Sequence, residues 1–548
     1  MFRRDRYRAG VVPAPIKALC AGAALRYPVG VEPGAGAGTA DQRADRTARW
    51  LWGILLLAAT LRIVAAMAPG FHHPDAIYQY LEPAYRLLTG AGVVTWEWRA
   101  GIRSWLLPLL LAGPMWVGER IDATSALPVL LPRLTMAGAS LSLVWSAWKL
   151  GGRASMQGTL LAGFIAATWF EFIHFGVQTL AEPIAVAALL PAAVLVTAAA
   201  PRRRAFALAG GLLTFAVLMR PHYAPAAAAL AIAVAWPVVT RRVPLREVRP
   251  GWVAFALGCL PVLVVSAGID VATGARPFAW IVENVRQNIV EQRAAAYGVL
   301  PPLTYVVWFG MLWQWWAIPL LIGVRFGWRL CPALVIAALV NLLLHSLIGH
   351  KEYRFVFLTS AALVTVSAAG WAVLLRLAAQ RWPSMGRGSM WAGIATVAVA
   401  AAWAAASLLL ARSDEMQNFI ERGRPGSVLF AALRRDPHVC GVALVDRPAF
   451  ADVPGRVSLR AGTPVFMFLR GDPALGRAGP WVAAQRWQGG FDRIIALLPP
   501  GPLPPGYRRG ACDTAGEYTL CLFSRPGPCR DARESPFALD RAMLRLKF

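Results

Sequence analysis

The sequence predicts an all-α polytopic membrane protein that carries a small soluble α/β domain at its C-terminal end. Of its 548 residues, 57% are hydrophobic and only 15% are charged, whereas soluble chains carry about a quarter charged residues. Apolar stretches of at least 17 residues recur between Leu51 and Ala411. Each is long enough to cross a hydrocarbon core of about 30 Å as a helix. After Arg412 the apolar runs become short and charged residues, Gly and Pro increase.

The apolar stretches predict about eleven transmembrane helices within a membrane domain of residues 49–411. They cover residues 51–67, 128–147, 156–176, 180–199, 206–221, 223–240, 251–269, 303–323, 331–349, 355–376 and 391–411. The stretch 104–117 is apolar but shorter, and we expect a tilted crossing, a half-span or a surface helix there.

The net charge of +26 does not indicate a nucleic-acid partner, because the basic residues fall in alternate connections between the spans. This alternation is typical of cytoplasmic loops. The clusters are Arg202–Arg204, Arg241 to Arg249, Arg325 with Arg329, and Arg376 to Arg387. The basic segment 1–48 lacks an apolar core, so we expect a disordered cytoplasmic tail rather than a signal peptide. The loop 68–127 and the residues after 411 then face outside.

The outer loop 68–127 gathers polar, charged and aromatic residues. Residues 75–89 read as an amphipathic helix that begins after Pro74. Asp75, Gln79 and Glu82 lie at i, i+4 and i+7, which predicts one shared face. A second amphipathic helix is expected within the outer loop 270–302, on the bilayer surface.

Residues 412–548 predict a small outer domain. Four short apolar runs, 441–445, 464–469, 494–498 and 518–523, read as strands. Four of the seven cysteines lie here: Cys440, Cys512, Cys521 and Cys529. An even number in an oxidising compartment predicts one or two disulfides, with three possible pairings.

Asp75 and Glu182 are the first candidates for chemistry. A carboxylate at a membrane surface can act as a general base, but Asp75 can equally cap its helix. Glu182 lies just inside a span, where ionisable groups are costly and usually functional or paired. Glu171 and His174 share a helix face nearby, and snorkelling explains them equally well.

Two cationic clusters, Arg220–His222 and His350–Arg354, end spans on the same outer side. Each can contact headgroups, or grip a phosphate. Their convergence with the acidic loop supplies a base, cations for a departing phosphate, and an apolar flank. A sugar carried on a polyprenyl phosphate requires that arrangement. The sequence requires no metal and no cofactor.

At these residues the chain resembles glycosyltransferase family 22. The stretches that carry the resemblance are His73–Glu82, Thr95–Trp98, Gly101–Pro108 and the block His350-Lys-Glu-Tyr-Arg-Phe, with Thr179–Glu182 and Arg220–Pro221. It covers about residues 50–380. It implies a GT-C fold and inverting transfer of mannose from a lipid phosphate, with Asp75 as the catalytic carboxylate. Where the family usually has a second acidic residue this chain has Ala76, so Glu82 or Glu182 would stand in.

The resemblance also suggests roles for further residues. Arg220, His350, Lys351 and Arg354 would bind the donor phosphate and its lipid, and the sugar or acceptor would contact His73, Gln79, Trp96, Glu97, Trp98 and Arg103. The expected partners are a polyprenyl-phosphate sugar, a glycan or glycolipid acceptor, and membrane lipids. The Ala- and Arg-rich composition indicates a bacterial inner membrane. Two alternatives remain open: a GT-C transferase for a pentose or an amino sugar, and a transporter or flippase without chemistry.

Overall fold

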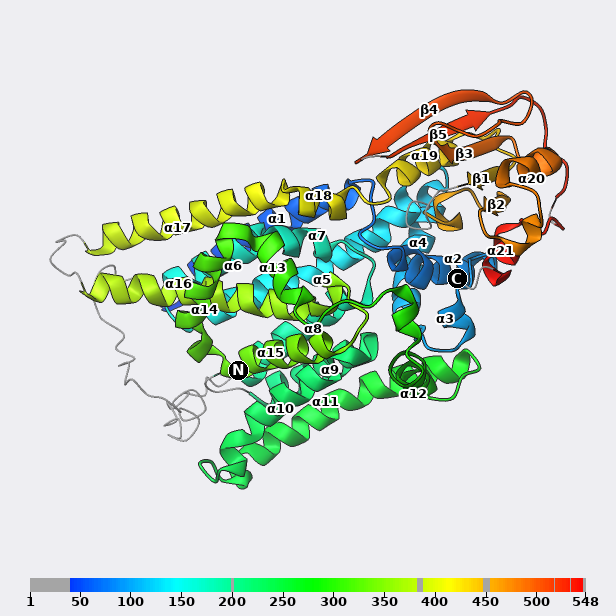
Figure 1. Cartoon of the computed structure of the whole chain (residues 1–548). Helices are drawn as coiled ribbons and strands as arrows, with labels where there is room; N and C mark the ends of the chain where they lie inside the picture. Colours follow the sequence, from blue (N-terminus) through cyan, green and yellow to red (C-terminus); the bar gives the residue numbers. More distant parts are fainter. Residues whose placement is uncertain are drawn as a thin grey trace, which may run out of the picture.

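The computed structural model describes residues 40–198, 202–381, 388–446, 454–516, 518–532 and 534–545. A long helical bundle is joined at one end to a small α/β domain (Figure 1). Most of the expected tail, residues 1–39, lies outside the described residues. Residues 40–48 belong to the first helix, so the expected tail boundary at 48 is too late.

The bundle is built from apolar helices at every predicted span. Their bounds are α1 (Ala40–Met67), α5 (Leu127–Gly151), α6 (Met156–Thr168), α7 (Phe170–Gly176), α8 (Ala181–Val196), α9 (Arg203–Met219), α10 (Ala224–Val239), α11 (Leu245–Ala272), α13 (Thr304–Trp313), α14 (Ala317–Gly327), α15 (Pro332–Leu347), α16 (Phe357–Arg381) and α17 (Gly388–Ala411). Many of their large apolar side chains are exposed, as lipid contact requires.

The expected count of eleven spans is not confirmed. Among the described residues, seven helical segments are long and apolar enough to cross a membrane, or eight if α6 and α7 form one span bent by 55°. Helices α8 and α15 have 16 residues each, or roughly 24 Å at 1.5 Å per residue. The bend follows from Trp169, whose extended backbone (φ −69°, ψ 125°) interrupts the helix.

Small residues allow close helix packing. Helices α14 and α16 meet at Gly323 and Gly370, where a Cβ on Gly370 would overlap the Gly323 carbonyl. Helices α9 and α11 pack in the same way at Gly210 and Gly258. Without a hydrophobic drive between helices in lipid, such close backbone contact supplies much of the packing energy.

The outer loop folds against one end of the bundle, which we call the site end. It contains a π-helix, η2 (Ala76–Leu81), and the helices α2 (Glu82–Thr89), α3 (Trp96–Arg99) and α4 (Leu106–Asp122). The 17-residue α4 covers the short apolar stretch, and it packs on α5. The loop 270–302 forms α12 (Ala279–Val285) followed by short π and 3-10 turns.

The C-terminal domain lies beyond the site end, beside α2 and α4 (Figure 1). Its sheet has the order β2-β1-β3-β5-β4, with β1 (Val442–Asp446), β2 (Val465–Leu469) and β3 (Arg493–Leu497) parallel. Strands β5 (Tyr518–Ser524) and β4 (Arg508–Ala515) continue it in antiparallel fashion. Three helices accompany the sheet: α19 (Arg424–Arg435), α20 (Pro480–Trp487) and α21 (Leu539–Arg545). The short helix α18 (Asp414–Ile420) precedes them and packs on α13 and α17 of the bundle. The four predicted strands are confirmed. The fifth, β4, has a polar, exposed sequence typical of a sheet edge.

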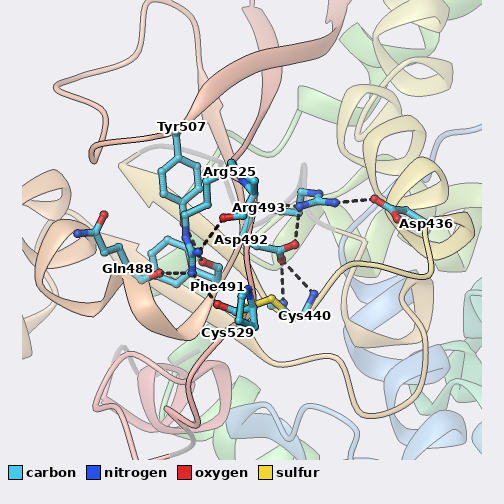
Figure 2. The surroundings of a disulfide bond; sticks show 12 residues. Asp436, Cys440, Gln488, Phe491, Asp492, Arg493, Tyr507, Arg525 and Cys529 are labelled. Atoms are coloured by element: carbon cyan, nitrogen blue, oxygen red, sulfur yellow. Dashed lines mark hydrogen bonds and ion pairs between the residues drawn. A yellow bond between two sulfur atoms is a disulfide. The ribbon is translucent and has the colours of Figure 1, made fainter.

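Two disulfides fix this domain, Cys440–Cys529 and Cys512–Cys521. Figure 2 shows the first, at the start of β1. The Asp492 carboxylate accepts the backbone N–H groups of Cys440 and Gly441 at 3.0 and 3.1 Å. The sequence left the pairing open, because it depends on which strands meet in space.

Candidate active site

Asp75 lies where the outer loop enters the π-helix η2. It occupies the N-cap position, but its side chain makes no capping hydrogen bond. The carboxylate instead accepts a hydrogen bond from Arg354, with 2.6 Å between Oδ2 and the guanidinium nitrogen. The capping interpretation of Asp75 is therefore wrong.

Arg354 stands at the centre of a buried ion cluster. Its side chain is only 2% exposed and pairs with Asp75, with Glu352 at 2.5 Å and with Glu182 at 3.5 Å. Glu182 in turn pairs with Arg220 at 2.7 Å. Segments far apart in the sequence thus meet at one point, as the sequence predicted for Asp75, Glu182, Arg220 and Arg354.

Electrostatics keep the Asp75 carboxylate charged. Burial is the largest single influence and would raise its pKa, but the Arg354 guanidinium, His73 and Arg103 together outweigh burial and hold the pKa well below its usual range. The pKa of Glu352 is lowered for the same reason.

His73 links the two carboxylates. The backbone N–H of Asp75 donates to His73 Nδ1 at 3.2 Å, which favours the tautomer with its proton on Nε2. That nitrogen lies 3.2 Å from Glu352 Oε2. Glu352 was not among our predicted site residues. Its place between two selected cations, Lys351 and Arg354, was the available signal.

A cleft opens beside this cluster. Its lining includes Arg103, Arg220, His222, Trp280 and Asn284, together with Tyr80 from η2. No carboxylate is among the described residues that line it. The cleft joins the ion cluster through Arg220, which forms an ion pair with Glu182. An anion can therefore enter here and meet two guanidinium groups without facing an acid.

Two of the predicted donor-binding residues lie away from this cleft. The Lys351 ammonium donates to the backbone carbonyls of His345, Ser346 and Ile348, at 3.3, 2.9 and 2.5 Å. These carbonyls lie at the C-terminal end of α15 and at its C-cap Ile348, where a helix runs out of its own N–H donors. His350 bonds to Glu352 at 2.9 Å and to the Gly298 carbonyl. Lys351 is a helix cap, and His350 orients Glu352.

Glu82 is also separated from the cluster. Its Oε2 accepts the Val93 N–H at 2.7 Å, and its Oε1 accepts the Val457 N–H at 2.8 Å. Both oxygens are occupied by backbone groups and the side chain is fully buried. This geometry contradicts the catalytic role predicted for Glu82. The residue separates from Asp75 because a π-helix has a longer turn than an α-helix, which displaces the i+4 and i+7 positions.

The remaining predicted residues form a rim on the outer loop. Gln79 accepts a hydrogen bond from Arg103 at 3.0 Å, and Glu97 lies 3.8 Å from the same guanidinium. Trp96 donates to the Tyr297 hydroxyl at 2.5 Å, so it binds the loop 270–302. Trp98 packs against Trp105, with ring centroids 4.4 Å apart. Arg103 also lines the cleft, and its predicted contact with the sugar or acceptor stays a prediction.

A second buried carboxylate, Glu171, supports the segment that carries Glu352 and Arg354. Glu171 of α7 accepts hydrogen bonds from Trp169 and Trp313 at 2.8 and 2.9 Å, from Ser360 at 2.8 Å, and from the Tyr353 hydroxyl. Tyr353 lies directly between Glu352 and Arg354 in the chain. Glu171 therefore fixes the segment that brings those two side chains to Asp75.

No side-chain group at this site has the geometry of a metal centre among the described residues. The one described group of suitable ligands is Cys440, Asp492 and Cys529 in the C-terminal domain, where the two cysteines are joined in a disulfide. A disulfide sulfur cannot serve as a thiolate ligand.

Some known proteins share the fold of this chain, and others share part of its sequence. The solved structure of ArnT from Cupriavidus metallidurans bound to undecaprenyl phosphate superposes with a TM-score of 0.54 at 11% identity, over 86% of this chain and 98% of that chain. Its apo structure superposes with a TM-score of 0.53, also at 11% identity, over 87% of this chain and 98% of that chain. The fold is thus that of the GT-C membrane glycosyltransferases.

Sequence comparison narrows the class. The family model of the Alg9-like mannosyltransferases matches residues 53–423, so the chain belongs to the Alg9-like mannosyltransferase family. GPI mannosyltransferase 3 of Yarrowia lipolytica is 29% identical over 323 residues, 56% of this chain and 59% of that protein. GPI mannosyltransferase 3 of Drosophila melanogaster is 35% identical over 132 residues, 24% of this chain and 22% of that protein. The chain thus matches about three fifths of the first of these relatives.

Proposed function

We propose that the chain transfers mannose from a polyprenyl-phosphate donor to a hydroxyl of a lipid-linked or cell-envelope glycan, with inversion at the anomeric carbon. The observation that carries this proposal is a cleft beside the Asp75 cluster whose lining includes both Arg103 and Arg220. A phosphate in that cleft would have its leaving-group oxygen close to the proposed base.

The path of the lipid chain supports a lipid-borne donor. An apolar groove of about 450 Å³ lies among α8, α10 and α15, lined by Val196, Ile232, Trp236 and Ile336 among others. These helices also carry Glu182 and approach Arg220 at the site end. Val196 is the fourteenth residue after Glu182 on α8, which is roughly 21 Å along a helix. A polyprenyl tail can occupy the groove while its phosphate reaches the cleft. The neighbouring ArnT was solved with undecaprenyl phosphate, and we extend that carrier class to this chain.

In this mechanism Asp75 is the general base. The acceptor hydroxyl attacks the anomeric carbon, its proton passes to Asp75, and the bond from that carbon to the phosphate oxygen breaks. The electron pair leaves with the polyprenyl phosphate, where Arg220 and Arg103 stabilise the growing charge. A single displacement of this kind inverts the anomeric centre.

Donor binding would also strengthen the base. In the structure Arg354 keeps the pKa of Asp75 low, and a carboxylate of low pKa is a weak base. An incoming phosphate competes with the carboxylates for Arg220 and Arg354. Once Arg354 moves toward the phosphate, burial of Asp75 raises its pKa. Donor binding would thus precede proton transfer.

Replacement of Asp75 tests the proposal. In proteoliposomes supplied with polyprenyl-phosphate mannose and membrane glycolipid acceptors, Asp75→Asn is expected to lose about 10² to 10⁴ in turnover. Donor binding is expected to persist, because the phosphate contacts come from arginines. Glu283→Gln is the matched control, since Glu283 pairs with Arg286 on the exposed loop. Full activity of Asp75→Asn would contradict the role of Asp75.

The donor sugar and the side of the membrane need separate measurements. A panel of polyprenyl phosphates bearing mannose, a pentose or an amino sugar is expected to give turnover with mannose. Reporter fusions after Arg242 and Arg412 are expected to read cytoplasmic and external in a bacterial inner membrane. Turnover with the pentose alone would contradict the mannose proposal, and reversed fusions would contradict the outward orientation.

A further inference from the structure

We infer that the C-terminal domain is a docked support for the catalytic segment of the outer loop, and that Glu82 is the positioning residue that joins them. The family match ends at residue 423, so the match assigns no role to this domain. The inference rests on the proposed function only in its activity readout, because it assumes there that Asp75 is the base.

Glu82 bridges two parts of the chain with one carboxylate. One oxygen accepts the backbone N–H of Val93, eleven residues later in the outer loop, and the other accepts the backbone N–H of Val457 in the C-terminal domain. Glu82 and Val457 both have no exposed surface. A buried carboxylate whose two oxygens each accept a backbone N–H is costly to disrupt, because its loss leaves two buried donors without partners.

Two glycines allow the backbone to come close to Glu82, one in the outer loop and one in the C-terminal domain. A Cβ on Gly455 would overlap Glu82 Oε1, and a Cβ on Gly92 would overlap the Glu82 carbonyl. Gly455 also has φ +73°, a conformation that other residues rarely adopt. Glycines therefore permit the approach at each side of the junction.

A second joint holds the same surface. The Arg434 guanidinium is 2% exposed and donates to the carbonyls of Val457 and Leu459 at 2.7 and 3.1 Å. It also bonds to the Ala123 carbonyl at 2.9 Å and pairs with Glu119 of α4 at 2.6 Å. Arg434 thus fixes the turn that presents Val457 and attaches it to the outer loop.

The junction connects directly to Asp75. The backbone N–H of Glu82 donates to the Ile77 carbonyl and closes the π-helix that begins after Asp75. At the other end of that π-helix, the Thr179 hydroxyl donates to the Ala76 carbonyl at 3.0 Å. A π-helix is less favourable than an α-helix and persists when its surroundings hold it. Glu82 and Thr179 are the two anchors of this one.

Hydrogen–deuterium exchange on the full-length protein in lipid nanodiscs tests the inference. Glu82→Gln keeps the size of the side chain but leaves one acceptor oxygen for two N–H donors. Exchange is expected to rise at least tenfold in peptides covering residues 76–93 as well as 454–459. A rise confined to 454–459 would overturn the inference, because the π-helix would then be independent of the domain.

Asp472→Asn is the matched control. Asp472 is a buried carboxylate that pairs with Arg545 at 2.7 Å, and its hydrogen-bond partners Ala474 and Arg545 belong to the C-terminal domain and not to the outer loop. Its replacement is expected to raise exchange within the domain and leave residues 76–93 unchanged. Increased exchange of 76–93 in this variant, equal to that in Glu82→Gln, would mean that any loosening of the domain has the same effect, and Glu82 would lose its specific role.

Gly455→Ala disrupts the same junction from the C-terminal domain, because the added Cβ would overlap Glu82 Oε1. It keeps the inference testable if Glu82→Gln fails to fold. It is expected to loosen the same peptides, and the double variant is expected to be no worse than the more severe single variant, because both disrupt one contact. Additive effects would contradict a shared junction.

Kinetics give the second readout. In Glu82→Gln, kcat is expected to fall while KM for the lipid donor stays within about twofold, and Glu82→Asp is expected to recover part of kcat. If exchange rises at residues 76–93 and kcat does not change, the junction stands and the proposed role of Asp75 is what fails.

Discussion

At the residue scale, the structure distinguishes the arginines that line the cleft from a cation that serves the fold. Arg220 lines the cleft and pairs with Glu182, whereas the three donors of Lys351 are directed at helix carbonyls. Both residues were predicted to bind the donor phosphate, because a sequence shows charge and not direction. Arg220 and Arg103 line the cleft and Lys351 does not, so in the proposed mechanism the two arginines contact the phosphate.

This difference gives a prediction about donor binding. Arg220→Gln is expected to weaken binding of a polyprenyl phosphate by about tenfold to about a hundredfold, because a hydrogen bond to a charged group contributes about 1.5–3 kcal/mol. Lys351→Met is expected to leave that affinity unchanged and to lower the melting temperature instead. Isothermal titration with undecaprenyl phosphate in nanodiscs measures both, and Arg220→Lys serves as the charge-retaining control. Weaker binding by Lys351→Met would contradict the assignment.

At the scale of single elements, the buried carboxylate of Glu171 joins α7, α13 and α16. Two of its donors are indoles, which can only donate, and two are hydroxyls, which can also accept. A glutamine can direct its carbonyl at Trp169 and Trp313 and its amide at Tyr353 and Ser360. The network therefore depends on the shape and polarity of residue 171 more than on its charge.

The second prediction follows from that network. Glu171→Gln is expected to keep most of the stability and activity, whereas Glu171→Leu leaves four buried donors without partners and is expected to cost several kcal/mol. Ser360→Ala removes one donor and is expected to cost about 1 kcal/mol. Thermal unfolding in detergent and turnover of the same preparations measure these effects. A stable and active Glu171→Leu variant would refute the supporting role.

At the scale of the whole molecule, the buried side chain of Glu82 makes the attachment of the C-terminal domain to the outer loop dependent on pH. Burial raises the pKa of Glu82 to about 7, although the N–H groups of Val93 and Val457 act in the opposite direction. The folded state therefore binds the proton more tightly than the unfolded chain, whose glutamates titrate near pH 4.5. The stabilising contribution of this proton is fully present below about pH 4.5 and is lost as the pH rises through about 7.

The third prediction concerns that pH range. Attachment of the C-terminal domain is expected to weaken between about pH 5 and pH 8, seen as faster amide exchange of residues 454–459 relative to a peptide standard. Glu82→Gln cannot titrate at this position, so its exchange ratio between the two pH values is expected to be flat. An equal pH dependence in both proteins would assign the effect to other groups. The Asp75 carboxylate, with its lowered pKa, contributes only at more acidic pH.

The sequence alone predicted the helical membrane class, the short strands of the C-terminal domain, and the four residues Asp75, Glu182, Arg220 and Arg354 that meet in the ion cluster. Apolar runs of span length leave a chain few choices in lipid, and short motifs are visible without coordinates. The edge strand β4 was not predicted, because a strand exposed at the edge of a sheet does not need the apolar pattern that marks a buried strand. Tertiary structure alone decided the disulfide pairing, the π-helix that separates Glu82 from Asp75, and the directions of Lys351 and Arg103. Each of these depends on which distant backbone groups meet, and a one-dimensional pattern does not contain that information.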